Sequence, residues 1–219
     1  MIIAIDGTAA SGKGTLGRTL AMRLGLDYLD TGQLYRAVAY AAKKAKIDID
    51  NADPNAFCEI IDKLDLSRQF SDALRQSEIG ELASKVAAIP QVRAGLLEKQ
   101  RQFAFNPPNG VGAVLDGRDI GSVVLPQADA KFYIDAAADI RATRRHLELK
   151  ARGQDIPFSE VLADLIKRDC RDKNRTVAPL IAAEDAFFID SSDKNADEVL
   201  TMVLDYLGQS KTHQLAGGF

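Results

Sequence analysis

The clearest chemical signal in the sequence is a glycine-rich loop close to its first residue. Residues 7–13, GTAASGK, fit the spacing G-x-x-x-x-G-K, and they lie between the apolar run 2–6 and a segment whose leucines recur at helical spacing. In such a loop, consecutive backbone N–H groups surround phosphate oxygens, and the following helix adds roughly half a positive charge at its N-terminus. Lys13 brings a full charge to the outer phosphates. The loop therefore predicts a nucleoside triphosphate site, to which a plain glycine-rich turn is the alternative.

The residue after this lysine departs from the common form of the loop. Most such loops place a Ser or Thr there to hold Mg²⁺, whereas this chain has Gly14 and brings the hydroxyl one residue later, at Thr15. A glycine inside a helix costs about 1 kcal/mol relative to alanine, so its presence needs a compensating reason. Close approach of a ligand to the first helical turn is such a reason. The order K-G-T therefore favours a site where two nucleotides meet over one where a single nucleotide is hydrolysed.

Arginines occur in several separate segments, as a site for two phosphate-bearing molecules requires. The guanidinium group keeps its charge and can bind phosphate through two N–H groups at once. Arg36 lies within a predicted helix, and Arg118 follows a predicted strand, at the edge where α/β sheets bind ligands. More basic residues gather later in the chain, namely Arg141, Arg144, Arg145, Lys150, Arg152, Lys167, Arg168, Arg171, Lys173 and Arg175. This gathering favours a compact anionic ligand. The alternative is a solvated helix face with intrahelical ion pairs, because four acidic residues are interleaved: Glu148, Asp164, Asp169 and Asp172.

Composition and charge limit the class of protein. The chain has 219 residues, of which 46% are hydrophobic and 27% charged, as is typical of a globular protein with one substantial core. Its formal net charge of −3 argues against a general nucleic-acid-binding protein. No apolar run approaches the roughly 20 residues that span a bilayer. Cys58 and Cys170 fit neither a disulfide scaffold nor a metal-binding pair. We therefore expect no nucleic-acid or membrane partner.

The start of the chain and its apolar pattern lead to two further expectations. The first residues, MIIAID, contain no basic segment followed by an apolar stretch and a cleavage site, so we expect no export signal and a cytoplasmic location. No long apolar stripe is left over for a partner, so we expect a monomer.

Short apolar runs alternate with segments of helical periodicity, which indicates a parallel α/β sheet. A helix is predicted from about Gln33 to Lys46, after the second run. Five runs are predicted as buried strands: 2–6, 26–30, 112–116, 131–135 and 186–190.

Two stretches interrupt this alternation. Residues 51–110 contain mainly helical patterns, near 55–65, near 77–88 and from Pro90 onwards. Residues 150–175 are rich in charge. We interpret the first stretch as an inserted lobe and the second as a smaller insertion. The core is then formed by residues 1–50, 111–149 and 176–219.

Several stretches, taken together, resemble the bacterial cytidylate kinases. The loop GTAASGKGT is similar to that of nucleoside monophosphate (NMP) kinases in general, and the narrower match runs across nearly the whole chain. The stretches that carry it are DTGQLYRA (30–37), ASKVAAIPQVR (83–93), EKQRQF (98–103), LDGRDIGSVVLPQADAKFYIDA (115–136), RRHLELKARG (144–153) and RDCRDKNR (168–175).

This resemblance implies both a fold and a reaction. The fold is the three-layer P-loop kinase fold, an α/β fold with a five-stranded parallel sheet, an NMP-binding lobe at 51–110 and a small mobile lid at 150–175. The reaction is ATP + CMP (or dCMP) ⇌ ADP + CDP (or dCDP). Mg²⁺ is expected to bridge the phosphates of the donor.

The resemblance also assigns roles to individual residues. The donor ATP would be held by Gly7, Thr8, Ala9, Ala10, Ser11, Gly12, Lys13, Gly14 and Thr15. The acceptor CMP or dCMP would be held by Thr31, Tyr35, Arg36, Ser84, Arg93, Arg118, Asp119, Arg168, Asp172 and Arg175. The catalytic residues would be Lys13, Arg118 and Arg175, and the candidate ligands for Mg²⁺ are Thr15 and Asp116.

Several of these roles have structural alternatives. Ser84 could instead be a hydroxyl on a helix surface, and Asp119 could be an ion-pair partner. Asp116 could instead cap the turn that follows it. Arg144 and Arg145 have two interpretations, contact with the donor or structural packing. The spacing of Arg168, Arg171 and Arg175 predicts that all three lie on one helical face.

The chain departs from its relatives at a few positions. Thr8 and Ala10 stand where relatives often carry Pro and Gly, Ser122 stands where Thr is commoner, and Gln76 ends a segment that usually ends in Thr. None of these departures removes a charged or polar group to which a role is assigned.

Three rival functions remain open on the sequence alone. A P-loop kinase acting on UMP, dTMP or shikimate is the nearest. A GTP-dependent switch is disfavoured because the chain has no N-K-x-D motif and has K-G-T in place of K-S/T. A nucleotide-sensing module without turnover is disfavoured by the number of arginines around the predicted cleft.

The base-reading role of Asp119 leads to a prediction. Cytosine presents an amino donor where uracil presents a carbonyl acceptor, so a carboxylate bonds the first and repels the second. We expect Asp119→Asn to lose more activity on CMP than on UMP, measured as kcat/KM on both substrates. Equal losses on the two would contradict a role in base selection.

Overall fold

The computed structural model describes residues 1–64 and 72–216, and its centre is a five-stranded parallel sheet. The strand order is β2-β3-β1-β4-β5, which places β1, the strand leading into the glycine-rich loop, in the middle. The predicted five-stranded parallel sheet is confirmed, and each predicted strand lies within one residue of its expected bounds. The prediction that β5 is buried is wrong, because this strand lies at the edge of the sheet and only Ile189 of its four residues is buried. The strands are β1 (Ile2–Gly7), β2 (Asp27–Asp30), β3 (Ala113–Gly117), β4 (Ala130–Asp135) and β5 (Phe187–Asp190).

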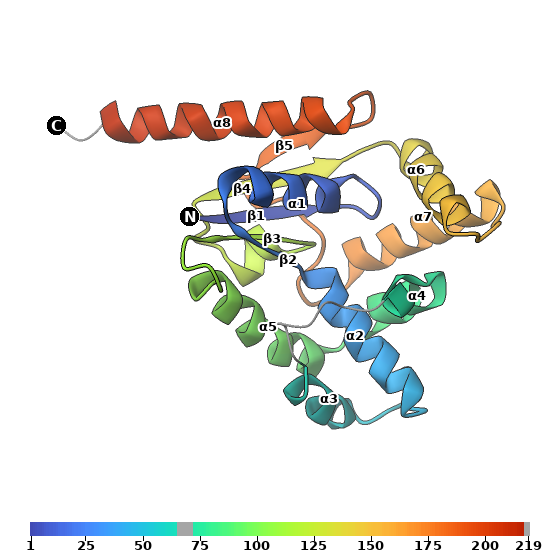
Figure 1. The fold of residues 1–219 in the computed structure, drawn as a ribbon. Coiled ribbons are helices and arrows are strands. Elements are labelled where there is room, and N and C mark those ends of the chain that lie inside the picture. The colour runs from blue at the N-terminus through green and yellow to red at the C-terminus, as the bar shows by residue number, and fades with distance from the viewer. Residues whose placement is uncertain (65–71, 217–219) are drawn as a thin grey trace.

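Helices cover both faces of this sheet and complete the three layers (Figure 1). Successive side chains of a strand point to opposite faces, and β1 shows this clearly. Ile3 and Ile5 pack with the helices α1 and α8, whereas Ala4 packs with α2 and α5. Both faces are apolar because both are covered. The bounds of these helices are α1 (Lys13–Leu24), α2 (Thr31–Lys44), α5 (Pro90–Phe105) and α8 (Ala196–Ala216).

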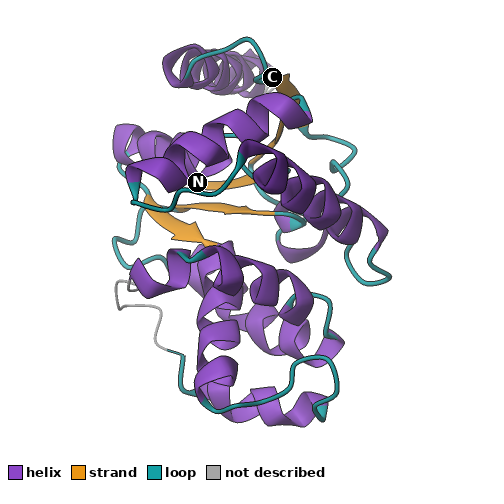
Figure 2. Cartoon of the chain, turned by 90° about the vertical axis from the view of Figure 1, so that its right-hand side faces the viewer, coloured by secondary structure: helices purple, strands orange, loops and turns teal. Residues whose placement is uncertain are grey.

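The predicted inserted lobe consists of short helical elements beside α2. Figure 2 shows these helices gathered on one side of the strands. Their apolar residues belong to the same cluster as the sheet, since Phe57, Val86 and Leu96 are buried together with Leu115 of β3. The elements are the 3₁₀ turns η1 (Pro54–Phe57) and η2 (Asp72–Arg75) and the helices α3 (Cys58–Asp62) and α4 (Ser77–Val86), followed by α5. Residues 65–71 of the predicted lobe and 217–219 of the predicted core lie outside the described residues.

The charged segment near the predicted lid forms two helices, α6 (Ala138–Ala151) and α7 (Phe158–Asn174). A small apolar cluster, with Val161 and Leu165 of α7 and Leu149 of α6, packs them onto Ala9 of the glycine-rich loop. The expectation that Arg168, Arg171 and Arg175 share a helical face is wrong. α7 ends at Asn174, and Arg175 follows it with an extended backbone, so its side chain leaves the helix surface.

No helix in the described part of the chain combines the length and the hydropathy that crossing a bilayer requires.

Every strand carries an aspartate at or next to its carboxyl end, and the buried Asp6 of β1 illustrates the use of this position. Its two carboxylate oxygens accept hydrogen bonds from the backbone N–H groups of Ile120 and Gly121, both at 2.7 Å. Those residues begin η3 (Ile120–Val124), a π-helical turn directly after Arg118 and Asp119. Burial raises the pKa of Asp6 to about 7, although both N–H groups oppose the shift. Asp6 thereby fixes the start of η3 and the residues before it.

We predict that Asp6→Asn lowers the free energy of unfolding by about 1–3 kcal/mol, because an amide NH₂ would face one of the two backbone N–H groups and leave it unpaired. Urea unfolding followed by circular dichroism measures the change. Asp205→Asn removes the same charge from an exposed position of α8 and serves as the control. An Asp6→Asn variant as stable as this control would contradict the proposed anchoring.

Candidate functional site

Two adjoining cavities open where the strands of the sheet end. The first, called the lobe cavity, has a volume of about 290 Å³ and lies between the inserted lobe, the ends of β2 and β3, and α7. The second, called the loop cavity, has a volume of about 500 Å³ and lies between the glycine-rich loop, α6 and the start of α8. Four residues line both: Ala10, Lys13, Arg145 and Glu148. A group bound at Lys13 is therefore accessible from both cavities.

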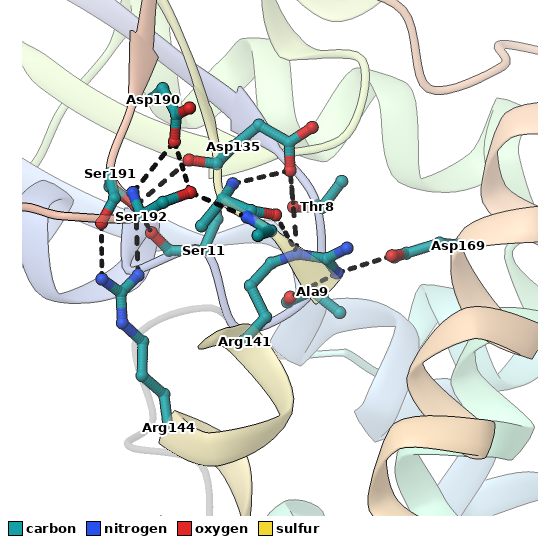
Figure 3. A network of polar contacts seen from close by, with 12 residues as sticks. Thr8, Ala9, Ser11, Asp135, Arg141, Arg144, Asp169, Asp190, Ser191 and Ser192 are labelled. Atoms are coloured by element: carbon teal, nitrogen blue, oxygen red, sulfur yellow. Dashed lines mark hydrogen bonds and ion pairs between the residues drawn. The ribbon is translucent and has the colours of Figure 1, made fainter. Parts of the chain in front are cut away.

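The glycine-rich loop leads from β1 into α1 and is tied down at both ends (Figure 3). At its start, the buried Thr8 hydroxyl donates to Asp135 Oδ1 at 2.5 Å. Towards its end, the Ser11 carbonyl accepts from the Ser191 hydroxyl at 3.0 Å. Gly12 has φ 94°, which a glycine tolerates without strain, and α1 begins directly after it. Gly7 and Thr8 line neither cavity, so their contribution to the predicted donor site is to shape the loop.

Positive charge is crowded around Lys13. Burial and the Arg118 guanidinium lower the pKa of Lys13 to about 8. Burial and the same neighbour lower the pKa of Arg168 to about 9. Burial and Arg145 lower the pKa of Arg36 to about 10. Each of these side chains would be stabilised in its charged form by an anion placed among them.

Two buried aspartates hold the arginines in place, and the first is Asp119. Its Oδ2 accepts from Arg93 and its Oδ1 accepts from Arg175, 3.3 Å away. Arg175 also donates to the carbonyl of Ala178. The ion-pair alternative for Asp119 is therefore present, and it joins the inserted lobe to the segment that follows α7.

The second aspartate is Asp172 of α7. Its Oδ2 accepts from Arg118 Nε at 2.9 Å, and its Oδ1 accepts from the hydroxyl of Ser84 at 3.0 Å. Burial alone would raise the pKa of Asp172, but Arg118 and Arg168 hold it below its usual range. Ser84 is thus buried in the cleft rather than exposed on a helix surface.

The remaining predicted acceptor residues also line the lobe cavity. Arg36 reaches across to the lobe, where it donates to the carbonyl of Leu74 at 2.7 Å. Tyr35 lies with its ring 5.9 Å from the guanidinium carbon of Arg93. The Thr31 hydroxyl donates to the carbonyl of Asp116 at 2.7 Å, which links the start of α2 to the end of β3. All ten predicted acceptor residues therefore surround one cavity.

Asp116 and Thr15 were predicted to hold a divalent cation. Asp116 is buried, and its Oδ1 has no hydrogen-bond partner. Burial and the neighbouring Asp30 raise the pKa of Asp116 to about 7. Asp116 lines the lobe cavity and Thr15 the loop cavity, on either side of Lys13. An orphaned carboxylate oxygen beside a phosphate loop fits Mg²⁺, which is usually held by few protein ligands together with substrate phosphates. Within the described residues, no three acidic, His or Cys side chains form a metal-binding group of their own.

Comparison with known proteins gives a consistent result. A family model described as cytidylate kinase matches residues 3–209. A cytidylate kinase of Paramagnetospirillum magneticum is 49% identical over 210 residues, which cover 96% of this chain and 99% of the relative. A cytidylate kinase of Rhodospirillum rubrum is 49% identical and covers 94% of this chain and 97% of the relative.

The chain belongs to the cytidylate kinase family. The fold is also similar to that of a solved but uncharacterized protein from Eubacterium ventriosum, with a TM-score of 0.53 and 15% identity over 95% of this chain and 98% of that one.

Sequence reasoning missed one wall of the site in this member of the cytidylate kinase family. The loop cavity is closed by residues that follow β5 and begin α8, including Ser191, Lys194 and Asn195. Arg144 ties this wall to α6, because it donates to the carbonyl of Ser191 at 2.6 Å. Arg145 instead pairs with Glu148 at 2.8 Å and lines both cavities. The signal was present as a polar stretch directly after a predicted strand, where α/β sheets bind ligands.

The environment of Gly14 gives a second reason for that glycine beside the predicted one. A Cβ at this position would lie 3.3 Å from Asp116 Oδ2 and 3.6 Å from the Tyr28 hydroxyl. The first distance is shorter than ordinary van der Waals contact. The Asp116 carboxylate therefore packs closely against the first turn of α1 at this position, and Gly14 also lines the loop cavity.

We predict that Gly14→Ala displaces the Asp116 carboxylate and lowers turnover about tenfold, because catalytic groups tolerate only small displacements. Stability should not fall with it, since alanine favours a helix over glycine by about 1 kcal/mol. Turnover as a function of Mg²⁺ concentration, together with thermal unfolding, measures both effects.

Gly208→Ala in α8 is the control for this change, since its Cβ would meet nothing within 4 Å. Unchanged turnover in Gly14→Ala would show that Asp116 is not sensitive to position 14.

Proposed function

We propose that this protein transfers the γ-phosphoryl group of ATP to CMP or dCMP, giving ADP and CDP or dCDP. The observation that carries the proposal is the crowding of partly buried cations where two cavities meet. Burial and the Arg118 guanidinium lower the pKa values of Lys13 and Arg168, and an anion among these cations would relieve the repulsion. Two nucleotides that meet end to end would supply such anions from both sides.

The donor side of this proposal is the loop cavity. The backbone N–H groups at the start of α1 would hold the ATP phosphates, with Lys13 at the terminal one. The nucleoside would extend towards the wall formed by Arg144 and the residues after β5. When bound, Mg²⁺ would neutralise charge on the donor phosphates, and Thr15 and Asp116 are the residues that would hold it.

The acceptor side is the lobe cavity. Arg36 and Arg118 would bind the acceptor phosphate, while Arg168 and Asp172 would lie against the ribose hydroxyls. Ser84, Arg93 and Asp119 would contact the cytosine. Each oxygen of Asp119 already accepts from an arginine, but a carboxylate oxygen can accept more than one hydrogen bond and keeps capacity for an amino group.

Transfer requires alignment more than acid–base chemistry, since the phosphoryl group moves between oxygens already in line. Arg118 and Arg175 would stabilise charge on the moving group together with Lys13. Residues 51–110 and 150–175 are proposed as the NMP-binding lobe and the lid, whose approach would keep water from competing as acceptor. We further propose a monomer that works in the cytoplasm, where its two free and exposed cysteines would stay reduced.

A coupled assay of ADP release tests the proposed reaction. With ATP and Mg²⁺, we expect rapid ADP formation on adding CMP or dCMP, much slower formation with UMP or AMP, and almost none without an acceptor. ADP release independent of any acceptor would indicate an ATPase. Binding of both nucleotides without ADP release would indicate a sensor, and a preference for UMP would indicate a different kinase.

Arg118→Met should lower kcat with CMP by at least about a hundredfold, as expected for removing one stabilising cation. Arg23→Met, which removes an exposed arginine from the last turn of α1, is the matched control and should leave turnover unchanged.

A further inference from the structure

Arg141 is a buried arginine that lines neither cavity but makes contacts on three sides (Figure 3). It lies in the first turns of α6, and only 5% of its surface is exposed. Its Nε donates to the carbonyl of Ala136 at 2.7 Å, just after β4. Its Nη1 donates both to the carbonyl of Ala9, at 3.2 Å, and to Asp169 Oδ2, at 2.5 Å. One guanidinium therefore connects the sheet, the glycine-rich loop and α7.

The Ala9 carbonyl occupies a special place in the loop. Thr8 on one side is fixed by its bond to Asp135, and Ser11 on the other is fixed by Ser191. Ala10 lies between these tethers with φ 60°, in the left-handed region that alanine rarely adopts. The hydrogen bond from Arg141 to the Ala9 carbonyl therefore depends on the conformation of the strained middle of the loop.

Asp169 depends on Arg141 for its charge balance. It is buried on α7, and its second oxygen, Oδ1, has no hydrogen-bond partner. A buried carboxylate that loses its closely paired cation is strongly destabilised, so the position of Asp169 follows that of the Arg141 guanidinium. Since the same nitrogen, Nη1, serves both Ala9 and Asp169, a movement of the loop carbonyl acts directly on this pair.

Helix α7 carries residues of the acceptor side next to Asp169. Arg168 precedes it, and Asp172 lies one turn further on, bonded to Arg118 and Ser84. The helix is therefore held on one side by the bonds of Asp172 to Arg118 and Ser84, and on the other side by the bond of Asp169 to Arg141. A shift of Asp169 would carry Arg168 and Asp172 with it.

We propose that Arg141 is a positioning residue that couples the two nucleotide sites. Donor phosphates bound in the loop fix the position of the Ala9 carbonyl, and through it the positions of Arg141 and Asp169. Helix α7 is then placed so that Arg168 and Asp172 can contact the acceptor. A bound donor consequently raises the affinity for the acceptor nucleotide, and by linkage the acceptor raises the affinity for the donor by the same factor. This inference rests on the proposed function, since it takes ATP and CMP as the ligands.

Isothermal titration calorimetry tests this coupling. The dissociation constant of CMP is measured with and without a saturating non-hydrolysable ATP analogue and Mg²⁺, in the wild type, Arg141→Met, Asp169→Asn and the double variant. We expect the analogue to tighten CMP binding at least about fivefold in the wild type. In either single variant the ratio should fall towards one, and the double variant should fall no further. The ratio is formed within each variant, so a change in the CMP dissociation constant without the analogue does not enter it.

Lys131→Met is the matched control. Lys131 is also a buried cation, on β4, paired with Asp185 at 2.8 Å and bonded to the carbonyl of Pro126, and it lines neither cavity. This variant should keep the wild-type ratio, and Arg141→Lys should restore part of it. If Arg141→Met does not fold, Asp169→Asn carries the test, because it removes the charge at nearly constant size.

Three results would overturn the inference: a wild-type ratio of one, a full ratio in Asp169→Asn, or an equal loss in Lys131→Met. A wild type that bound no CMP at all would contradict the proposed function itself. Binding of both nucleotides with an unchanged ratio in the variants would contradict only the coupling.

Discussion

Partly buried positive charge is the constraint on which the rest of the site depends. Lys13, Arg36 and Arg168 face one another across a partly closed cleft, and each is destabilised there by burial and by a cationic neighbour. Like charges in a poorly hydrated space separate unless something holds them. Asp119 and Asp172 hold the cations in place by forming ion pairs with arginines from different elements. The inserted lobe, the end of β3 and α7 therefore meet around these two carboxylates. The protein thus balances part of the charge itself and leaves the remainder for phosphate groups.

The parallel sheet supplies the places where these charges can be held. Each strand has an aspartate at or next to its carboxyl end, and the five are used differently according to the loop that follows. Asp6 binds the backbone of η3, Asp135 binds Thr8 of the glycine-rich loop, and Asp190 accepts from the backbone and hydroxyl of Ser192. Asp116 keeps an unpartnered oxygen beside Lys13, and Asp30 lines the lobe cavity next to it. Three of these carboxylates shape loops, and two remain available at the site.

Local patterns in the sequence predicted what depends on local spacing. The loop at 7–13 and the five strands could be recognised because their signals lie within a few neighbouring residues. Partnerships across the chain could not be recognised in this way. The wall after β5 reaches the loop 180 residues away through the bond from Ser191 to Ser11, and nothing in either segment alone specifies that contact. Arg175 was misplaced because the helix ends one residue before it, and the close contact between Gly14 and Asp116 was missed because Asp116 lies on β3, far away in the sequence. Both interpretations of the basic stretch 141–175 hold for part of it. Arg141 is buried in the protein, whereas Arg152 forms an ion pair with Glu148 four residues before it, as on a solvated helix face.

The apolar cluster that Phe57, Val86 and Leu96 share with Leu115 has a consequence for how the molecule comes apart. Because the described part of the inserted lobe shares its interior with one face of the sheet, melting it would expose that face as well. Lobe and sheet should therefore denature as one cooperative unit rather than in two steps. Opening of the cleft is then expected to be a rigid tilt about this common interior, since local melting of the lobe would also uncover one face of the sheet.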